Sequence, residues 1–400
     1  MNKHRTQGFT LVEIMVAMVI SLVILGGAIS VLVQNQRNYR ENDDFGRLQE
    51  NARFALDLIS TDLRMAGFMG CARNNTQDDR DTARDGKGGN AKALKIYSNL
   101  TGIEAGSLLD LGSLTDKSNY LDGWEDSAPG TWGASNAADP DPASIDGFIL
   151  KGTDAILIRR LRNRGVPITK DMKELDDPIE VTAVPVNAGE IAAIYDCEGT
   201  DIFQVTDSTA NTIQHKDGNP GNLTASLRRT YLQNSSYLKN PDALGNQAKT
   251  FVAAVDATRY YISNETERPS LWRQYYTGAG IDKQELVEGI ENMQILYGVD
   301  ATDPLETFDG VPDDYRTADK VEKWNYVVAV RITMLIATVD EYGADKDDKM
   351  YDINGTPDNA GDDWQAPGDR RMRKLVTSTV LLRNMQARLA SEGDAPVVKE

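Results

Sequence analysis

The sequence comprises 400 residues, with 43 lysines and arginines against 61 aspartates and glutamates, and a formal net charge of −18. This acidic balance repels polyanions at long range, so we do not expect the surface as a whole to bind nucleic acid. The two histidines and two cysteines argue against zinc sites and leave almost no base for a nucleophilic triad. No phosphate-binding loop or nucleophile elbow appears either, so we expect no enzyme activity, no metal and no cofactor.

The N-terminal region begins with a short polar and basic stretch, residues 1–8, and continues into an almost unbroken apolar run, residues 11–33. About 20 helical residues span the core of a bilayer, so this run is long enough to cross a membrane. Lys3 and Arg5 precede it, which favours a cytoplasmic N-terminus and places the rest of the chain outside the cytoplasm. Two alternatives are a secretory signal, which would have a shorter apolar core, and a plain signal anchor.

A single carboxylate, Glu13, lies near the start of the apolar run. An ionisable group in a membrane span costs a few kcal/mol, so Glu13 needs a partner. Residues 8–13 resemble the class III leader of type IV pilins and pseudopilins. The resemblance implies that a prepilin peptidase cleaves between Gly8 and Phe9 and that Phe9 is then N-methylated. It also implies that Glu13 pairs with the N-terminal amine of a neighbouring subunit during assembly.

The helix is expected to continue beyond the membrane, because apolar and small residues recur at three- and four-residue steps. These are Phe45, Leu48, Ala52, Ala55, Leu56, Ile59, Leu63 and Ala66. The pattern predicts one helix over roughly 10–66, with Gly67 and Gly70 as plausible stops. Gly26 and Gly27, inside the span, are either tolerated small residues or a point where the helix loosens during assembly.

The remaining sequence favours β-structure, and we expect the α+β class: a long N-terminal helix packed on an antiparallel or mixed β-sheet domain. The predicted divisions are a leader (1–8), a transmembrane and assembly half-helix (9–33), an amphipathic half-helix (34–66), a long loop-rich region (67–146) and a β-rich globular domain (147–400). Strands are predicted at 155–159, 179–184, 190–195, 201–205, 251–262, 270–276, 325–338 and 373–382. Residues 285–297 fit either a helix or a strand.

Two later segments, residues 285–300 and 375–384, resemble elements of PilW-type minor pilins and of the related J-type minor pseudopilins. The resemblance implies a noncatalytic minor pilin, anchored in the inner membrane with a periplasmic domain, that primes pilus assembly and then lies at the pilus tip. Its expected partners are other minor pilins, the major pilin, the prepilin peptidase, the inner membrane and a tip adhesin. The alternatives are a J-type minor pseudopilin of a type II secretion system, or a membrane-anchored periplasmic binding protein or enzyme.

The two cysteines, Cys71 and Cys197, fall outside the cytoplasm in the predicted orientation. Disulfides are favoured in that oxidising compartment, so we expect the two residues to pair and to join the globular domain to the end of the long helix. Two separate buried thiols are the alternative.

Other chemically suggestive groups favour structural interpretations. The acidic residues of 345–363 could bind calcium, but their spacing does not match an EF-hand and a solvated loop is expected. We expect the same of Asp139, Asp141 and Asp146. His215 lies in a polar, turn-rich stretch and is expected to be solvated. The aromatic residues Tyr260, Tyr261, Trp272, Tyr275 and Tyr276 are expected in the core or in cross-strand pairs. One dense basic cluster, expected to be solvated at a strand end, consists of Arg159, Arg160, Arg162 and Arg164.

Overall fold

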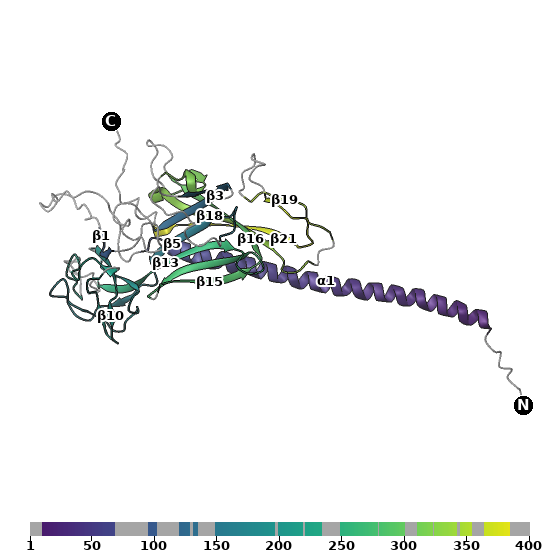
Figure 1. Cartoon of the computed structure of the whole chain (residues 1–400), viewed down its shortest axis with the longest axis horizontal. Coiled ribbons are helices and arrows are strands. Elements are labelled where there is room, and N and C mark those ends of the chain that lie inside the picture. The colour runs from purple at the N-terminus through teal and green to yellow at the C-terminus, as the bar shows by residue number, and fades with distance from the viewer. Residues whose placement is uncertain are drawn as a thin grey trace, which may run out of the picture.

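In the computed structural model, one long α-helix precedes a series of β-sheets (Figure 1). The structure describes residues 10–68, 95–101, 120–128, 131–134, 149–196, 199–218, 221–233, 249–278, 280–300, 310–322, 324–341, 345–353 and 364–384. The arrangement confirms the predicted α+β class.

The helix, α1 (Leu11–Met65), is unbroken, and its first half projects away from the sheets (Figure 1). Its second half buries the predicted apolar stripe against the sheets, and the buried residues include Leu48, Ala52, Ala55, Ile59 and Leu63. Phe45 differs from the prediction, because its side chain is 42% exposed. The helix ends where Gly67 adopts φ 71°, a left-handed conformation that glycine tolerates at helix ends.

The largest sheet is organised around its longest strand, β13 (Phe251–Ser263). The first residues of β13 pair with β8 (Ile191–Tyr195), and later residues pair with β5 (Ala155–Leu161) and β14 (Ser270–Thr277). The sheet is completed by β1 (Lys95–Ser98), β3 (Leu121–Ala128), β4 (Thr131–Ala134), β6 (Val166–Pro167), β9 (Gly199–Gln204) and β15 (Gly280–Glu288). It is a mixed sheet, because β1 and β9 run parallel and its other pairs are antiparallel.

A second sheet has the strand order β17 (Asp314–Arg316), β16 (Ile290–Val299), β18 (Val327–Ala337) and β21 (Arg373–Leu381). A single residue, Gly289, connects β15 to β16 and so joins the two sheets. Its φ of 87° disfavours any residue with a side chain, and an added Cβ would lie 2.7 Å from the Ala337 carbonyl oxygen. The second half of α1 contacts β5, β15, β18 and β21, so both sheets hold the helix.

Smaller elements complete the described part of the chain. They are β2 (Leu100–Thr101), β7 (Ile179–Glu180), β10 (Asp207–Ser208), β11 (Thr212–Gln214), β12 (Gly221–Asn222), β19 (Met350–Tyr351), β20 (Trp364–Gln365), and the 3-10 helices η3 (Ala318–Lys320) and η4 (Trp324–Tyr326). One hydrophobic cluster joins α1 to the two large sheets, and a second lies beneath β8, β9 and β13.

The ambiguous segment 285–297 is strand throughout apart from Gly289, because it forms the end of β15 and most of β16. The described part of 67–146, predicted to be mostly loop, contains the four strands β1 to β4. The strand prediction at 179–184 was too long, since β7 covers only Ile179–Glu180. The aromatic residues do form cross-strand neighbours, and Tyr261 lies opposite Trp272 with both side chains buried.

Candidate functional site

The start of α1 holds the one carboxylate of the apolar segment in a capping box. The backbone N–H of Thr10 donates to Glu13 Oε2 at 2.9 Å, and the Thr10 hydroxyl donates to the same oxygen at 3.0 Å. Glu13 N–H in turn donates to Thr10 Oγ1 at 3.3 Å. Reciprocal hydrogen bonds of this kind satisfy backbone N–H groups that have no partner within the first turn of a helix. They also give the Glu13 carboxylate hydrogen-bond donors within its own chain. Thr10 is a site residue that our sequence reasoning missed, although its Thr-x-x-Glu spacing was a usable signal.

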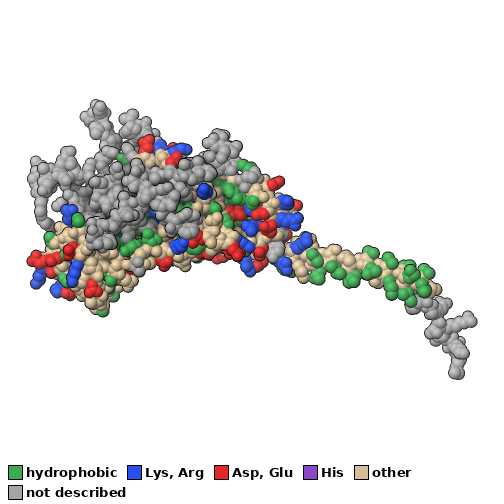
Figure 2. All heavy atoms as spheres, viewed as in Figure 1, with side chains coloured by type: hydrophobic (Ala, Val, Ile, Leu, Met, Phe, Trp, Pro, Cys, Tyr) green, Lys and Arg blue, Asp and Glu red, His purple; other side chains and the backbone are tan. Residues whose placement is uncertain are grey.

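The apolar half of α1 presents its side chains to the surroundings on every side. Its large hydrophobic residues, such as Leu11, Val23 and Ile24, are 74%, 71% and 66% exposed. Figure 2 shows hydrophobic side chains along the projecting helix, away from the charged surface of the sheets. This helix is long and apolar enough to cross a membrane. Such a surface is matched by lipid or by the helices of other subunits, and not by water.

Inside this segment, Gly26 and Gly27 are helical, and apart from the adjacent residues and the backbone of the same helix no heavy atom lies within 4 Å of the position where a Cβ would be. The Ser30 hydroxyl donates to the Gly26 carbonyl at 2.9 Å, which satisfies that polar group within the helix. The open space beside the two glycines allows a neighbouring helix to approach the backbone closely.

The far end of α1 is fixed to the sheets by polar contacts. Asp62 accepts from Arg160 Nη2 at 2.7 Å and from the Tyr260 hydroxyl at 2.8 Å. Burial and the nearby Asp62 raise the pKa of Tyr260 well above its ordinary value, so the phenol remains a donor. At the helix end, Asn384 Nδ2 donates to the carbonyls of Arg64 at 3.3 Å and Ala66 at 3.1 Å. Asn384 follows β21, so the terminal strand caps the long helix.

The prediction of a solvated basic cluster is wrong for Arg159 and Arg160 on β5, which are buried and half-buried, whereas Arg162 and Arg164, which follow β5, are exposed as expected. Arg159 is 1% exposed and its Nη1 lies 2.5 Å from Asp122 Oδ2. Arg160 pairs with Asp62, and Arg162 pairs with Asp256 at 3.0 Å and Glu190 at 3.1 Å. The ion pairs of Arg160 and Arg162 line a groove of about 460 Å³ between α1 and the sheet. Because acids neutralise these three arginines, they do not offer a phosphate-binding surface.

Two family models match the chain. A prokaryotic N-terminal methylation motif matches residues 3–29, and Type IV Pilus-assembly protein W matches residues 259–384. These two matches support a PilW-type minor pilin. No curated protein and no solved structure matches the chain.

The PilW match runs from within β13 to Asn384, so it covers the second sheet and the residue that caps α1. The methylation motif covers Thr10, Glu13 and the glycine pair. The residues of α1 that pack on the sheets, such as Ala55 and Asp62, lie between the two matched segments. This family suggests a structural, non-enzymatic protein that interacts with other pilus components and is held by a single-pass membrane anchor.

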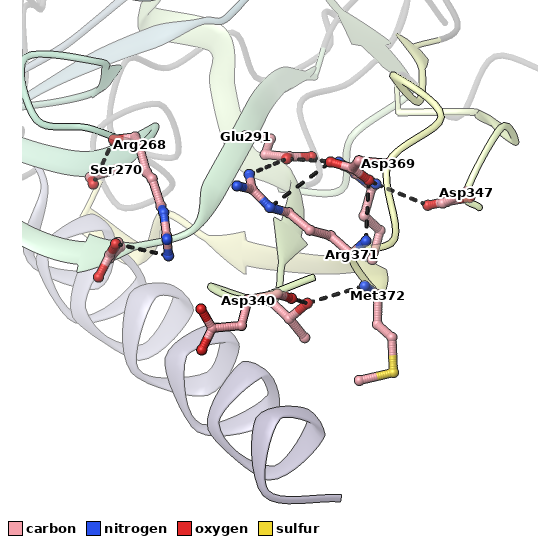
Figure 3. A network of polar contacts seen from close by, with 11 residues as sticks. Arg268, Ser270, Glu291, Asp340, Asp347, Asp369, Arg371 and Met372 are labelled. Atoms are coloured by element: carbon pink, nitrogen blue, oxygen red, sulfur yellow. Dashed lines mark hydrogen bonds and ion pairs between the residues drawn. The ribbon is translucent and has the colours of Figure 1, made fainter. Parts of the chain in front are cut away.

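Within the PilW match, Arg373 is the centre of an ion-pair network that joins β16 and β21 to Asp347 and Asp369. Figure 3 shows the three carboxylates of this network, Glu291, Asp347 and Asp369. The Arg373 side chain is fully buried and contacts all three. The Tyr351 hydroxyl donates to Asp347 at 2.8 Å. Asp347 was expected in a solvated acidic loop, but it is 9% exposed and ion-paired. No cluster suited to a metal ion occurs among the described residues.

His215 is also buried, at 2% exposure, which corrects the expectation of a solvated histidine. Its Nδ1 lies 2.8 Å from the Ala225 carbonyl and its Nε2 lies 3.0 Å from the Asp177 carbonyl. The ring also packs against Phe203 at 5.3 Å. These contacts give His215 a structural role, in which it joins the segments that surround the second hydrophobic cluster.

Asp201 on β9 gives the domain a pH-dependent stability. Burial raises its pKa to about 6, although Tyr231 and Arg229 offset part of the effect. The folded state therefore binds the proton more tightly than the unfolded state, and stability falls as pH rises from about 4 to about 6. Asp201→Asn should raise the melting temperature at pH 7, by an amount equivalent to about 3 kcal/mol, and change it little at pH 4. Thermal melts of both proteins at the two pH values test this, and an equal difference at both would contradict it.

The other sequence-predicted site residues, Gly8, Phe9, Cys71 and Cys197, lie outside the described residues, as do Asp139, Asp141 and Asp146.

Proposed function

We propose that the chain is a minor pilin of a type IV pilus, acting in a membrane-anchored complex that primes pilus assembly and remains at the pilus tip. The observation that supports this most strongly is the construction of α1. Its first half is exposed, apolar and interrupted by one carboxylate, whereas its second half is locked into the sheets by burial and by Asp62 and Asn384. Because the helix is joined rigidly to the sheets, the place where its membrane half packs also fixes where the whole domain lies.

The proposed mechanism begins with cleavage between Gly8 and Phe9 by a prepilin peptidase and N-methylation of Phe9. The mature chain then waits in the inner membrane with its sheets in the periplasm. During this time Thr10 occupies the Glu13 carboxylate, so that an ionised group in an apolar surrounding keeps its hydrogen bonds. On assembly, Glu13 exchanges this local contact for the positive N-terminal amine of another minor pilin or the major pilin. That ion pair is stronger in a low dielectric than in water.

Deletion of the gene tests whether the chain serves a pilus or a secretion system. We expect cells that lack the protein to carry at least about tenfold fewer surface pili and to secrete their folded exoproteins normally. Pilus number and exoprotein secretion should both be measured in the same deletion strain. Complementation with the full chain should restore pili. Normal piliation together with loss of exoprotein secretion would contradict the pilus assignment and favour a J-type pseudopilin.

We further propose that Cys71 and Cys197 form a disulfide. Phe68, shortly before Cys71, is hydrogen-bonded to β5 through its carbonyl and Leu161 N–H at 2.9 Å, so the chain leaves the helix against the sheet. Reduction should lower the melting temperature of the full-length protein, because the bond restricts the unfolded chain. Two titratable thiols in the oxidised protein would exclude the bond.

A further inference from the structure

The strand β21 has one open edge. Among the described residues it pairs with β18 alone, at the margin of the second sheet. The bonds from Leu382 N–H to the Val328 carbonyl and from Thr338 N–H to the Met372 carbonyl show that even-numbered residues direct their polar groups to β18. Polar groups alternate along an antiparallel strand. The N–H and C=O groups of the odd-numbered residues between them therefore point away from β18, and these residues are Leu375, Thr377, Thr379 and Leu381.

This edge lacks the features that normally block strand addition. Proteins protect exposed edges with charges, prolines or bulges. Residues 375–381 contain no charge, proline or glycine, and their register with β18 is unbroken. The other long edge strand, β15, differs in each respect. It carries Asp282, Lys283 and Glu285, and its pairing with β14 is interrupted by a bulge. The contrast indicates that β15 is protected against pairing and that β21 is not.

The side chains of β21 also separate into two sets. Even-numbered residues face the helix and core, where Val380 is 3% exposed and Val376 packs against the hydrophobic cluster. Thr377, Thr379 and Leu381 are exposed on the other face, and Leu381 is 51% exposed. An incoming strand would thus meet unpaired backbone groups beside a neutral face of hydroxyl and apolar groups, which favours β-branched residues in the strand.

Positive charges lie at both ends of this neutral edge. Lys374 precedes it, with its ammonium 5.8 Å from the Phe45 ring centroid, and the exposed Arg383 follows it. A second copy of β21 would bring its own Lys374 and Arg383 to this edge, and would add positive charge where positive charge is already present. Like charges brought close together repel each other. The edge therefore disfavours a second copy of this chain and favours a strand with negative ends.

We propose that the open edge of β21 binds an extended strand from a different polypeptide, neutral and β-branched in its middle, with a carboxylate near each end. In strand addition, main-chain hydrogen bonds provide the affinity and the flanking side chains provide the specificity. Because β21 packs on α1 and leads into the helix cap at Asn384, the bound strand would lie beside the long helix. This inference does not depend on whether the chain serves a pilus or a secretion system.

The test uses the full-length protein in detergent micelles and two synthetic nine-residue peptides. Both alternate threonine and valine, and one ends in aspartates while the other ends in lysines. We expect the amides of Leu375, Thr377, Thr379 and Leu381 to exchange with deuterium rapidly in the free protein and at least about tenfold more slowly with the aspartate peptide. Fluorescence anisotropy should show the lysine peptide binding roughly tenfold more weakly at low salt.

A proline variant distinguishes peptide binding through backbone hydrogen bonds from peptide binding through side-chain contacts alone. Thr379→Pro removes an outward N–H without removing a bond to β18, and proline is tolerated at such edge positions. It should weaken binding of the aspartate peptide roughly tenfold, since one bond is lost and the ring obstructs the edge. Thr379→Val, which keeps the N–H, is the matched control and should bind normally. Leu381→Pro gives a second variant if Thr379→Pro fails to fold.

Four results would overturn the proposal. Slow exchange of the four amides in the free protein at every concentration would mean that the chain covers its own edge. Protection that grows with protein concentration would identify a second copy as the occupant. Equal binding of the two peptides would show that the positive charges at the ends of β21 do not select a strand with negative ends. Unchanged binding to a folded proline variant would exclude strand addition.

Discussion

Replacing Glu13 with alanine should strongly impair pilus assembly while leaving cleavage of the leader intact. The carboxylate is the one acidic group in the apolar segment of α1, and the leader peptide bond lies several residues before it. Without Glu13, the positive N-terminus of a neighbouring subunit would enter an apolar surrounding with no counter-charge, at a cost of a few kcal/mol. We expect surface pili, counted by electron microscopy, to fall by at least about tenfold, with the mature protein still present in the membrane.

Glu13→Gln distinguishes the two properties of this side chain. Glutamine also serves at the N3 position of a capping box, so the contacts with Thr10 survive, but it carries no charge. We expect Glu13→Gln to fail in assembly like Glu13→Ala. Val16→Ala, a neutral change on the same exposed segment, should assemble normally. Normal piliation with Glu13→Gln would show that the cap, and not the ion pair, is the function of this residue.

Replacing Arg373 with methionine should cause the largest loss of stability in the described part of the chain. The guanidinium contacts Glu291 at 2.6 Å, Asp369 at 2.6 Å and Asp347 at 3.3 Å, and the side chain is 0% exposed. Its hydrogen bonds hold the pKa of Asp369 below the ordinary value. Removing the arginine leaves three carboxylates that repel one another where water has little access. Breaking a buried ion pair from one side costs about 3–5 kcal/mol.

Denaturant unfolding of the full-length protein measures this loss. Arg370→Met is the matched control, because Arg370 is exposed and three residues away, and a surface change of this kind is expected to alter stability by less than about 0.5 kcal/mol. Adding Glu291→Gln and Asp369→Asn to Arg373→Met should restore part of the lost stability, since the repulsion is removed. A loss below about 1 kcal/mol for Arg373→Met alone would show that the network contributes little.

The long helix was predictable from sequence because its evidence is local. A continuous apolar run and a three- and four-residue period specify α1 almost to its ends, and the strand pattern identified most of β5, β8, β9, β13, β14, β18 and β21. Residues 285–297 were ambiguous because the spacing of apolar residues over so short a run fits both the 3.6-residue period of a helix and the two-residue period of a strand. Pairing with β14 and β18 resolves this segment as strand, and such partners lie far away in the sequence.

The polar interior was not predictable for the same reason. Arg159 and His215 looked like solvated groups because nothing near them in sequence supplies a partner. Their partners, Asp122 and the Asp177 carbonyl, come from distant parts of the sequence. Asn384 caps α1 although it lies 318 residues from Ala66 in the sequence. These groups come together only in the folded chain. The role of a buried polar group can therefore be assigned only once its partner is known.

The most direct test of the account is the N-terminus of the protein in its own membranes. Intact mass and N-terminal sequencing should be compared between a strain with its prepilin peptidase and one without it. We expect a mature chain that starts at N-methylated Phe9 only where the peptidase is present. An intact Met1 in both strains, or a cut after the apolar run, would contradict the pilin pathway and the role assigned to Glu13.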